Sequence, residues 1–177
     1  KALLYKYLGG VDAWPIMLDT KDPGKIIETV LLIQPGFGGV NLEDIAQPKC
    51  FEVLDTLRAR AEIPIWHDDQ QGTATVTLAA LINALKIVGK KMSETKIAFI
   101  GSGASNVACA RLIFAAGASP GLCRVVDSKG ILHKRRSDLE LRKAEFVDKW
   151  KMCQITNAEG LEGGIPEAMK GADVVIG

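Results

Sequence analysis

The amino-acid sequence predicts an α/β protein built on parallel sheets, and three observations lead to that class. Short apolar runs bounded by turn residues alternate with longer segments of helical spacing. Acidic residues or glycines follow several of the short runs. The chain of 177 residues, 47% of them hydrophobic, is long enough for one domain or two small ones with a core. Strands that alternate with helices in this way indicate parallel βαβ units.

The short apolar runs are the predicted strands: 14–18, 37–42, 63–66, 96–101, 123–127 and 172–177. The segment 23–33 has helical spacing, with Asp22 as the predicted N-cap and Pro23 in the first turn. In a second predicted helix, 49–61, Phe51, Leu54 and Leu57 repeat on one face. The polar stretch 89–96 is the predicted boundary between an α/β region at 1–90 and a second at 91–177.

A third helix is predicted from residue 137, where Ser137 and Glu140 have the spacing of a capping box. The capping box pairs a hydroxyl with the N–H of the third helical residue, and a carboxylate with the N–H of the cap. We therefore expect Ser137 to be the N-cap of a helix that runs through 150.

Composition narrows the classes of function. The net charge is +1, from 22 basic and 21 acidic residues, which favours neither nucleic acid nor a membrane surface as partner. No apolar run reaches the roughly 18 residues of a membrane span. The cysteines lack short metal-ligand spacing and indicate reduced thiols of the cytoplasm, with an organelle matrix as the alternative. They are Cys50, Cys109, Cys123 and Cys153.

Acidic residues follow three predicted strands. Glu43 and Asp44 follow the strand at 37–42, Asp68 and Asp69 follow the one at 63–66, and Asp19 follows the one at 14–18. The carboxyl ends of parallel strands share one rim, where ligands of open α/β sheets bind. Clustered carboxylates raise each other's pKa unless a cation neutralises them, and oxygen ligands suit Mg²⁺ or Mn²⁺. Alternatively, these acids cap the following helices.

A glycine loop is the second candidate site. The strand at 96–101 ends at Gly101, Gly103 follows, and a helical segment starts at once. Asp127 closes the next strand. This order is typical of a Rossmann-type dinucleotide fold, in which glycines and a helix N-terminus receive a pyrophosphate. An ordinary βα turn is the alternative. The candidate contacts are Gly101, Ser102, Gly103, Ala104, Ser105, Asn106, Asp127 and Ser128.

The choice between NAD and NADP stays open in the sequence. Asp127 can accept hydrogen bonds from a ribose diol and would repel a 2′-phosphate, which favours NAD. A basic run after it could neutralise that phosphate or be solvated surface. The run comprises Lys129, Lys134, Arg135 and Arg136.

Four stretches, "GVDAWPIMLDTKDP", "GGVNLEDIA", "IPIWHDDQQGTA" and "VVDSKGILHKRRSDL", closely resemble the malic enzyme family over nearly all 177 residues. The resemblance implies oxidative decarboxylation of malate to pyruvate and CO₂ with reduction of NAD or NADP. It implies that residues 1–90 are the C-terminal part of the family's N-terminal substrate and metal domain. Residues 91–177 would be the first part of a doubly wound Rossmann domain. Malate, oxaloacetate and pyruvate are the implied ligands, in a homodimer or higher homo-oligomer.

The resemblance also assigns site residues. Glu43, Asp44 and Asp69 match the ligands of Mg²⁺ or Mn²⁺, and we expect their carboxylates to converge without metal. Lys1 matches the lysine that takes the proton from the malate hydroxyl, and Asp68 matches the acid that supports it. An amine works as a base only if it is partly neutral near pH 7. At the start of this chain we expect the Lys1 ammonium to be solvated and protonated.

Three departures from the family affect the interpretation. Gln71 stands where bacterial relatives usually carry His, although Gln is familiar in the larger relatives and carries little weight, and Asn106 narrows the room beside the pyrophosphate. The family's tyrosine acid lies upstream of Lys1, and its substrate-contacting asparagines lie downstream of Gly177. We therefore expect a central fragment that is inactive alone. Packing roles are expected for Tyr5, Tyr7, His67 and His133.

Two rival functions remain on this reading. One is a malolactic-type or other 2-hydroxyacid decarboxylase on the same scaffold, which product analysis separates from a malic enzyme. The other is a non-catalytic module that binds metal and nucleotide.

Overall fold

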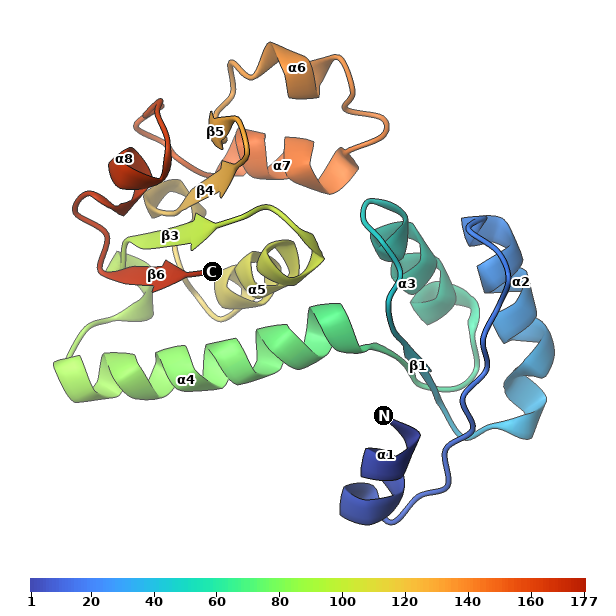
Figure 1. Ribbon diagram of the computed structural model, residues 1–177. Coiled ribbons are helices and arrows are strands. Elements are labelled where there is room, and N and C mark those ends of the chain that lie inside the picture. Colours follow the sequence, from blue (N-terminus) through green and yellow to red (C-terminus); the bar gives the residue numbers. More distant parts are fainter.

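The computed structural model describes residues 1–177 and has two separate sheets with helices packed around them (Figure 1). The strands are β1 (Val40–Leu42), β2 (Ile65–His67), β3 (Ile97–Ile100), β4 (Arg124–Asp127), β5 (Gly130–Ile131) and β6 (Val174–Ile176). The first sheet pairs β1 and β2 in parallel. In the second, β3 pairs in parallel with both β4 and β6, and β5 pairs antiparallel with β4. The predicted class, α/β with parallel sheets, is confirmed.

The helices fill the connections between these strands. They are α1 (Ala2–Gly9), α2 (Pro23–Ile33), α3 (Lys49–Arg60), α4 (Thr73–Val88), α5 (Ala104–Ala115), α6 (Ser137–Glu140), α7 (Val147–Ile155) and α8 (Ile165–Met169). Short 3₁₀ turns occupy Gln34–Gly36, Met92–Glu94 and Pro120–Leu122, and a π-helical turn at Asp68–Gly72 runs directly into α4. The predicted helices at 23–33 and 49–61 are confirmed.

Each sheet has its own core. The first core joins α2 and α3 to the inward face of β1 and β2 through Ile26, Ile27, Val30, Leu42, Val53, Leu54, Leu57 and Ile65. In the second sheet the residues of β3 alternate between two faces. Ile97 and Phe99 pack with α5 in the larger core, and Ala98 packs with Ala168 of α8 on the other face. Helices therefore cover both faces of the second sheet.

Helix α4 packs with the second core although it precedes the predicted boundary at 89–96. Figure 1 shows α5 between α4 and the second sheet. Ala74, Leu81 and Leu85 of α4 are buried in the same cluster as Phe99 and Ile113. The whole first sheet lies within residues 1–67. Helix α4 follows it in the chain and packs in the second core, so it connects the two regions.

Two predicted elements are wrong. Residues 14–18 form no strand, because no backbone hydrogen bond joins them to a strand, and Trp14 and Met17 are largely exposed. Ser137 is not an N-cap: α6 begins at Ser137 itself, behind Arg136, and no side chain caps it. The helix ends at Glu140, and α7 begins only at Val147. Arg136, the residue before α6, forms ion pairs with Asp127 and Asp138, which hold the start of this short helix.

The stretch Asp68–Val88 is long and apolar enough, by length and composition alone, to cross a membrane. The prediction that no stretch of the chain reaches that length is therefore wrong. The π-helical turn adds its residues to α4 without a break, which periodicity did not indicate. A mostly buried core helix passes the same test, but only 17% of this apolar window is buried; the buried side chains of α4 are Ala74, Leu81 and Leu85.

Replacing Asp22 with Ala is expected to lower the free energy of unfolding by about 1 kcal/mol. Its Oδ1 accepts hydrogen bonds from the N–H of Gly24 at 2.8 Å and of Lys25 at 3.4 Å, as predicted for the cap of α2. Urea denaturation measures the change. Asp19→Ala is the matched control, because Asp19 is exposed and caps no helix. Equal losses in both variants would remove the assignment of the cap.

Candidate functional site

The acidic residues meet at the carboxyl end of the first sheet. The parallel register pairs Leu42 of β1 with His67 of β2, so the residues that follow these two strands are neighbours. Glu43 and Asp44 follow β1, and Asp68 and Asp69 open the π-helical turn after β2. Such turns are rare and are frequent at functional sites. Asp19 follows no strand and is exposed, contrary to the prediction.

Lys1 is placed over two of these acids. Its Nζ donates a hydrogen bond to Asp68 Oδ2 at 2.8 Å and lies 3.4 Å from Glu43 Oε1. The predicted pairing of Lys1 with Asp68 is present. The hydrogen bond to Asp68, supported by Glu43, raises the pKa of the Lys1 ammonium, so the amine is protonated at neutral pH. Lys1 is exposed and protonated as expected, but its ammonium is paired with two carboxylates instead of being surrounded by solvent alone.

Asp44 and Asp69 are joined through the backbone. Asp44 has a φ of 59°, in the left-handed region that a residue with a side chain rarely adopts. Its N–H donates to Asp69 Oδ2 at 3.0 Å, which helps hold that conformation. Strained backbone of this kind clusters at functional sites. This hydrogen bond thus ties the turn after β1 to the turn after β2.

The donor set fits a hard divalent cation in type and place, because three carboxylates stand on two adjacent turns. The side chains do not converge on one centre, however, and no group of three or more His, Cys, Asp or Glu is arranged to hold a metal ion. Glu43 faces Lys1, and Asp69 faces the backbone of Asp44. The expected convergence of Glu43, Asp44 and Asp69 is therefore not met in this arrangement.

Sequence reasoning missed the contribution of Asn41. Its Nδ2 donates to Glu43 Oε2 at 3.2 Å, so Glu43 is held between Asn41 and Lys1. The available signal was spacing: residues two apart on a strand point to the same face. An amide at that position is suited to orienting a carboxylate.

His67 is fully buried beside the acids. Neither ring nitrogen has a hydrogen-bond partner, and Nδ1 lies 4.0 Å from Asp69 Oδ2. Burial lowers the pKa of His67, so the neutral imidazole is favoured. The packing role expected for this residue is consistent with its complete burial.

The glycine loop has the predicted strand–turn–helix form. Gly101 follows β3 with a φ of +108°, and Gly103 is the N-cap of α5, with no side chain capping the helix. The first N–H groups of α5 are therefore free to receive an anion. Asn106 Nδ2 donates to the backbone oxygens of Ile100 at 2.9 Å and Gly101 at 3.2 Å. The amide in the third small position thus braces the loop from within.

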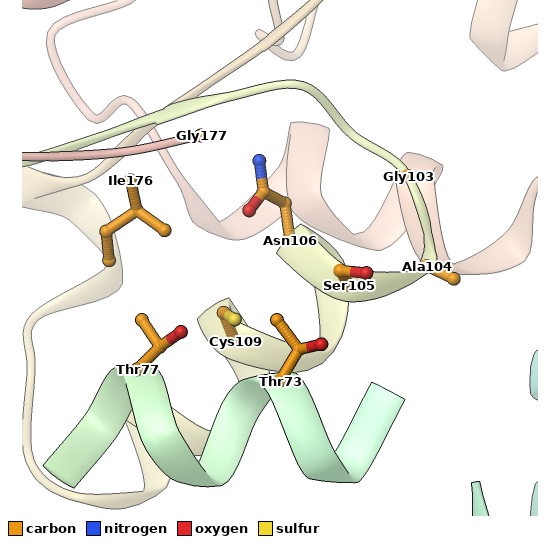
Figure 2. A pocket seen from close by; sticks show the side chains of 9 residues that line it. All are labelled: Thr73, Thr77, Gly103, Ala104, Ser105, Asn106, Cys109, Ile176 and Gly177. Carbon is orange, nitrogen blue, oxygen red and sulfur yellow. The ribbon is translucent and has the colours of Figure 1, made fainter. Parts of the chain in front are cut away.

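A cavity of about 330 Å³ opens beside this loop. Figure 2 shows α4 below it, with Thr73 and Thr77, and the first turns of α5 opposite, with Ser105, Asn106 and Cys109. Gly103, Ala104 and the end of β6 at Ile176 and Gly177 complete the lining. The contributions of α4 and Cys109 were not predicted, because only the packing of α4 on α5 brings them here.

Asp127 stands at the tip of β4, as predicted, but its carboxylate is already occupied. Arg136 donates to both oxygens, at 3.1 and 3.0 Å, the N–H of Lys129 donates to Oδ1 at 2.9 Å, and Lys149 Nζ lies 3.6 Å from Oδ2. Burial would raise the pKa of Asp127, but the bonds from Arg136 and Lys129 hold it below its ordinary value. Arg136 is buried, so this member of the basic run is not solvated surface.

Ser128 lies in a second cavity, of about 360 Å³, between the end of β4 and the start of α8. Lys129, Gly130, Gly163 and Gly164 share its lining. Ser102, by contrast, is buried inside the glycine loop. Six of the eight predicted dinucleotide residues therefore border two cavities at the carboxyl ends of β3 and β4, and Gly101 and Ser102 border neither.

The chain resembles known proteins over its full length. The family profile described as "Malic enzyme, NAD binding domain" matches residues 70–177. The NAD-dependent malic enzyme of Geobacillus stearothermophilus is 45% identical over 177 residues, and the alignment covers 100% of this chain and 35% of that protein. The bifunctional malic/malolactic enzyme of Bacillus subtilis is 43% identical, with 100% of this chain and 42% of that protein covered.

Solved structures agree with these relatives. The crystal structure of Entamoeba histolytica malic enzyme superposes with a TM-score of 0.91 at 52% identity, covering 99% of this chain and 37% of that one. The chain spans less than half the length of these proteins. A profile match over more than half of its residues, with full-length similarity in sequence and fold, shows that the chain belongs to the malic enzyme family.

Proposed function

We propose that the chain carries the acidic half of the substrate site and the dinucleotide loop of a metal-dependent, NAD(P)-linked malic enzyme, which converts malate to pyruvate and CO₂. The observation that carries the proposal is the junction of the two predicted sites. Ser105, in the first turn of α5, donates a hydrogen bond to the main-chain oxygen of Asp69 at 2.8 Å. A substrate at the acids would therefore lie beside a dinucleotide at the glycine loop, as hydride transfer requires.

Lys1 is the proposed base for the C2 hydroxyl of malate. Asp68 holds its Nζ in place, and Glu43 adds a second negative neighbour. These acids keep Lys1 protonated when nothing else is bound, so the amine loses its proton only when positive charge offsets them. Ligand binding and proton transfer are thereby linked, because Lys1 becomes a neutral amine, and so a base, only when the cation and substrate are bound.

Glu43, Asp44 and Asp69 are the residues proposed to hold Mg²⁺ or Mn²⁺. When bound, the cation would acidify the substrate hydroxyl and stabilise negative charge after CO₂ leaves. The support from the structure is the adjacency of the two acid-bearing turns and their oxygen-only donors. Glu43 must exchange its contact with Lys1 for that ligand role, so Lys1 and the cation compete for one carboxylate.

NAD or NADP is the proposed hydride acceptor, and the names of the relatives include both. The backbone N–H groups at 103–106 would receive the pyrophosphate. With both oxygens of Asp127 bonded to Arg136, a ribose would have to share that carboxylate with the guanidinium. The charge at this edge is balanced, which reduces the repulsion of a 2′-phosphate.

Replacing Asp127 with Ser is expected to shift the preference toward NADP by about tenfold, because it frees a guanidinium suited to phosphate. Dissociation constants for NAD and NADP on the full natural protein give the ratio. Asp138→Ser is the comparison: Asp138 also binds Arg136, but Asp127 then still holds two nitrogens of the guanidinium, so a much smaller shift is expected. Equal weakening of both nucleotides by Asp127→Ser would show that Asp127 does not read the ribose.

A malolactic reaction is a second candidate, favoured by the similarity to a relative named as bifunctional. Incubation of the full natural protein with malate, Mn²⁺ and NAD or NADP tests both. Pyruvate formed with an equal amount of NAD(P)H supports the malic enzyme reaction, and lactate without net NAD(P)H supports the malolactic one. If the protein formed neither pyruvate nor lactate, the proposed function would be contradicted. We expect the 177-residue chain alone to form no NAD(P)H, because the tyrosine acid that the family resemblance implies is not matched by Tyr5 or Tyr7.

A further inference from the structure

We infer that Ser105 is a positioning residue that couples dinucleotide binding to cation binding; the inference rests on the proposed function. The hydroxyl of Ser105 donates to the main-chain oxygen of Asp69 at 2.8 Å. Ser105 stands in the first turn of α5, where the proposed pyrophosphate binds, and Asp69 is a proposed cation ligand. One side chain therefore connects the two sites.

No other hydrogen bond joins the same two parts of the chain. The bond from Ser105 to Asp69 is the only one between residues 1–72 and residues 97–177. The other polar contacts across that division come from Arg111, which lies 3.9 Å from Asp55 and stacks over Phe51 at 5.2 Å. Both contacts join α5 to α3, outside the acidic rim and the glycine loop. At the ligand-binding edge, the hydroxyl of Ser105 is the polar tie.

The tie continues beyond Asp69. Asp69 Oδ2 accepts the N–H of Asp44, and this bond helps to hold the left-handed conformation of Asp44. The path from the glycine loop thus runs through Ser105 to the backbone of Asp69, then through its carboxylate to the turn after β1. Each step is a hydrogen bond between segments distant in sequence. A shift of the α5 N-terminus would move the turn that carries Asp69, and the turn of Asp44 with it.

The consequence is a reciprocal effect on affinity. A dinucleotide that fixes the N-terminus of α5 also fixes the backbone of Asp69, so less order remains to be gained when the cation binds. Linkage requires that the cation favour the dinucleotide by the same factor. The hydroxyl of Ser105 donates to the main-chain oxygen of Asp69 and not to an acid oxygen, so its part in the coupling runs through that main chain, while its backbone N–H stays available to the pyrophosphate.

The test is a coupling measurement on the full natural protein. Dissociation constants for NAD are measured with and without saturating Mn²⁺, and their ratio is compared among variants. Ser105→Ala keeps the backbone N–H but loses the hydroxyl, and we expect the ratio to fall by about fivefold, the effect of one neutral hydrogen bond. Ser105→Thr keeps the hydroxyl and should restore the ratio. Ser93→Ala, an exposed serine before β3, is the matched control and should leave it unchanged.

The outcomes are distinct. A wild-type protein that binds both NAD and Mn²⁺ with no coupling, or a Ser105→Ala variant with an unaltered ratio, would overturn the inference and leave the proposed function standing. Failure of Ser105→Thr to restore the ratio would assign the loss to packing and overturn the inference as well. A wild-type protein that binds neither ligand would remove the proposed function itself.

Discussion

Replacement of Lys1 by Ala in the full natural protein is expected to lower kcat by about 10²–10⁴-fold, the range for a positioned acid–base group. The loss should fall mainly on kcat, because proton removal from the hydroxyl belongs to the transition state. Affinity for Mn²⁺ should not weaken. Lys1 Nζ lies 3.4 Å from Glu43 Oε1, so its removal frees a proposed cation ligand from a competing charge. Steady-state kinetics and a Mn²⁺ titration measure the two effects.

Lys1→Arg is the matched control for this experiment. The guanidinium keeps a positive charge for Asp68 and Glu43, but it stays protonated in proteins and cannot serve as a base. If Lys1 is the base, the Arg variant should be about as inactive as the Ala variant. If Lys1 only pairs with the acids, Lys1→Arg should retain most of the activity, and that result would sink the assignment.

Much of the fold could be predicted because local signals and packing agree. Asp22 caps α2 as its residue type indicates, and Phe51, Leu54 and Leu57 face the core as their spacing requires. The strands β3, β4 and β6 form from the predicted runs. Residues 14–18 have the composition of a strand but no partner ladder. Whether an apolar run becomes a strand depends on pairing partners, which a local pattern does not contain.

The residues that form the site could be predicted better than the contacts that they make. The shared rim of β1 and β2 follows from parallel pairing, so Glu43, Asp44, Asp68 and Asp69 could be grouped from the sequence. The partners of the acids could not. Arg136 covers both oxygens of Asp127 because the chain turns back after β5, and Ser105 reaches Asp69 because α4 packs on α5. Both contacts depend on tertiary geometry between segments distant in sequence.

Replacement of Asp69 by Asn is expected to weaken Mn²⁺ binding by at least about 10–100-fold. Loss of a group that only supports a metal ligand costs 10–100-fold, and a charged ligand itself should cost no less. The substitution is conservative for the protein: the amide oxygen can still accept the N–H of Asp44, and the main-chain oxygen still accepts Ser105 Oγ. The fold and the turn should therefore persist while the charge is lost. Titration of the full natural protein with Mn²⁺, followed by the signal of the free ion, gives the affinity.

Asp68→Asn separates the two neighbouring acids. Asp68 binds Lys1 Nζ and is not a proposed cation ligand, so its amide should lower kcat with only a small change in Mn²⁺ affinity. The two variants lose the same charge one residue apart, which cancels the general effect of net charge on cation binding. A difference between them therefore reports direct ligation by Asp69. Equal affinities in the two variants, whether high or low, would mean that Asp69 holds no cation, and the metal assignment at this rim would have to be withdrawn.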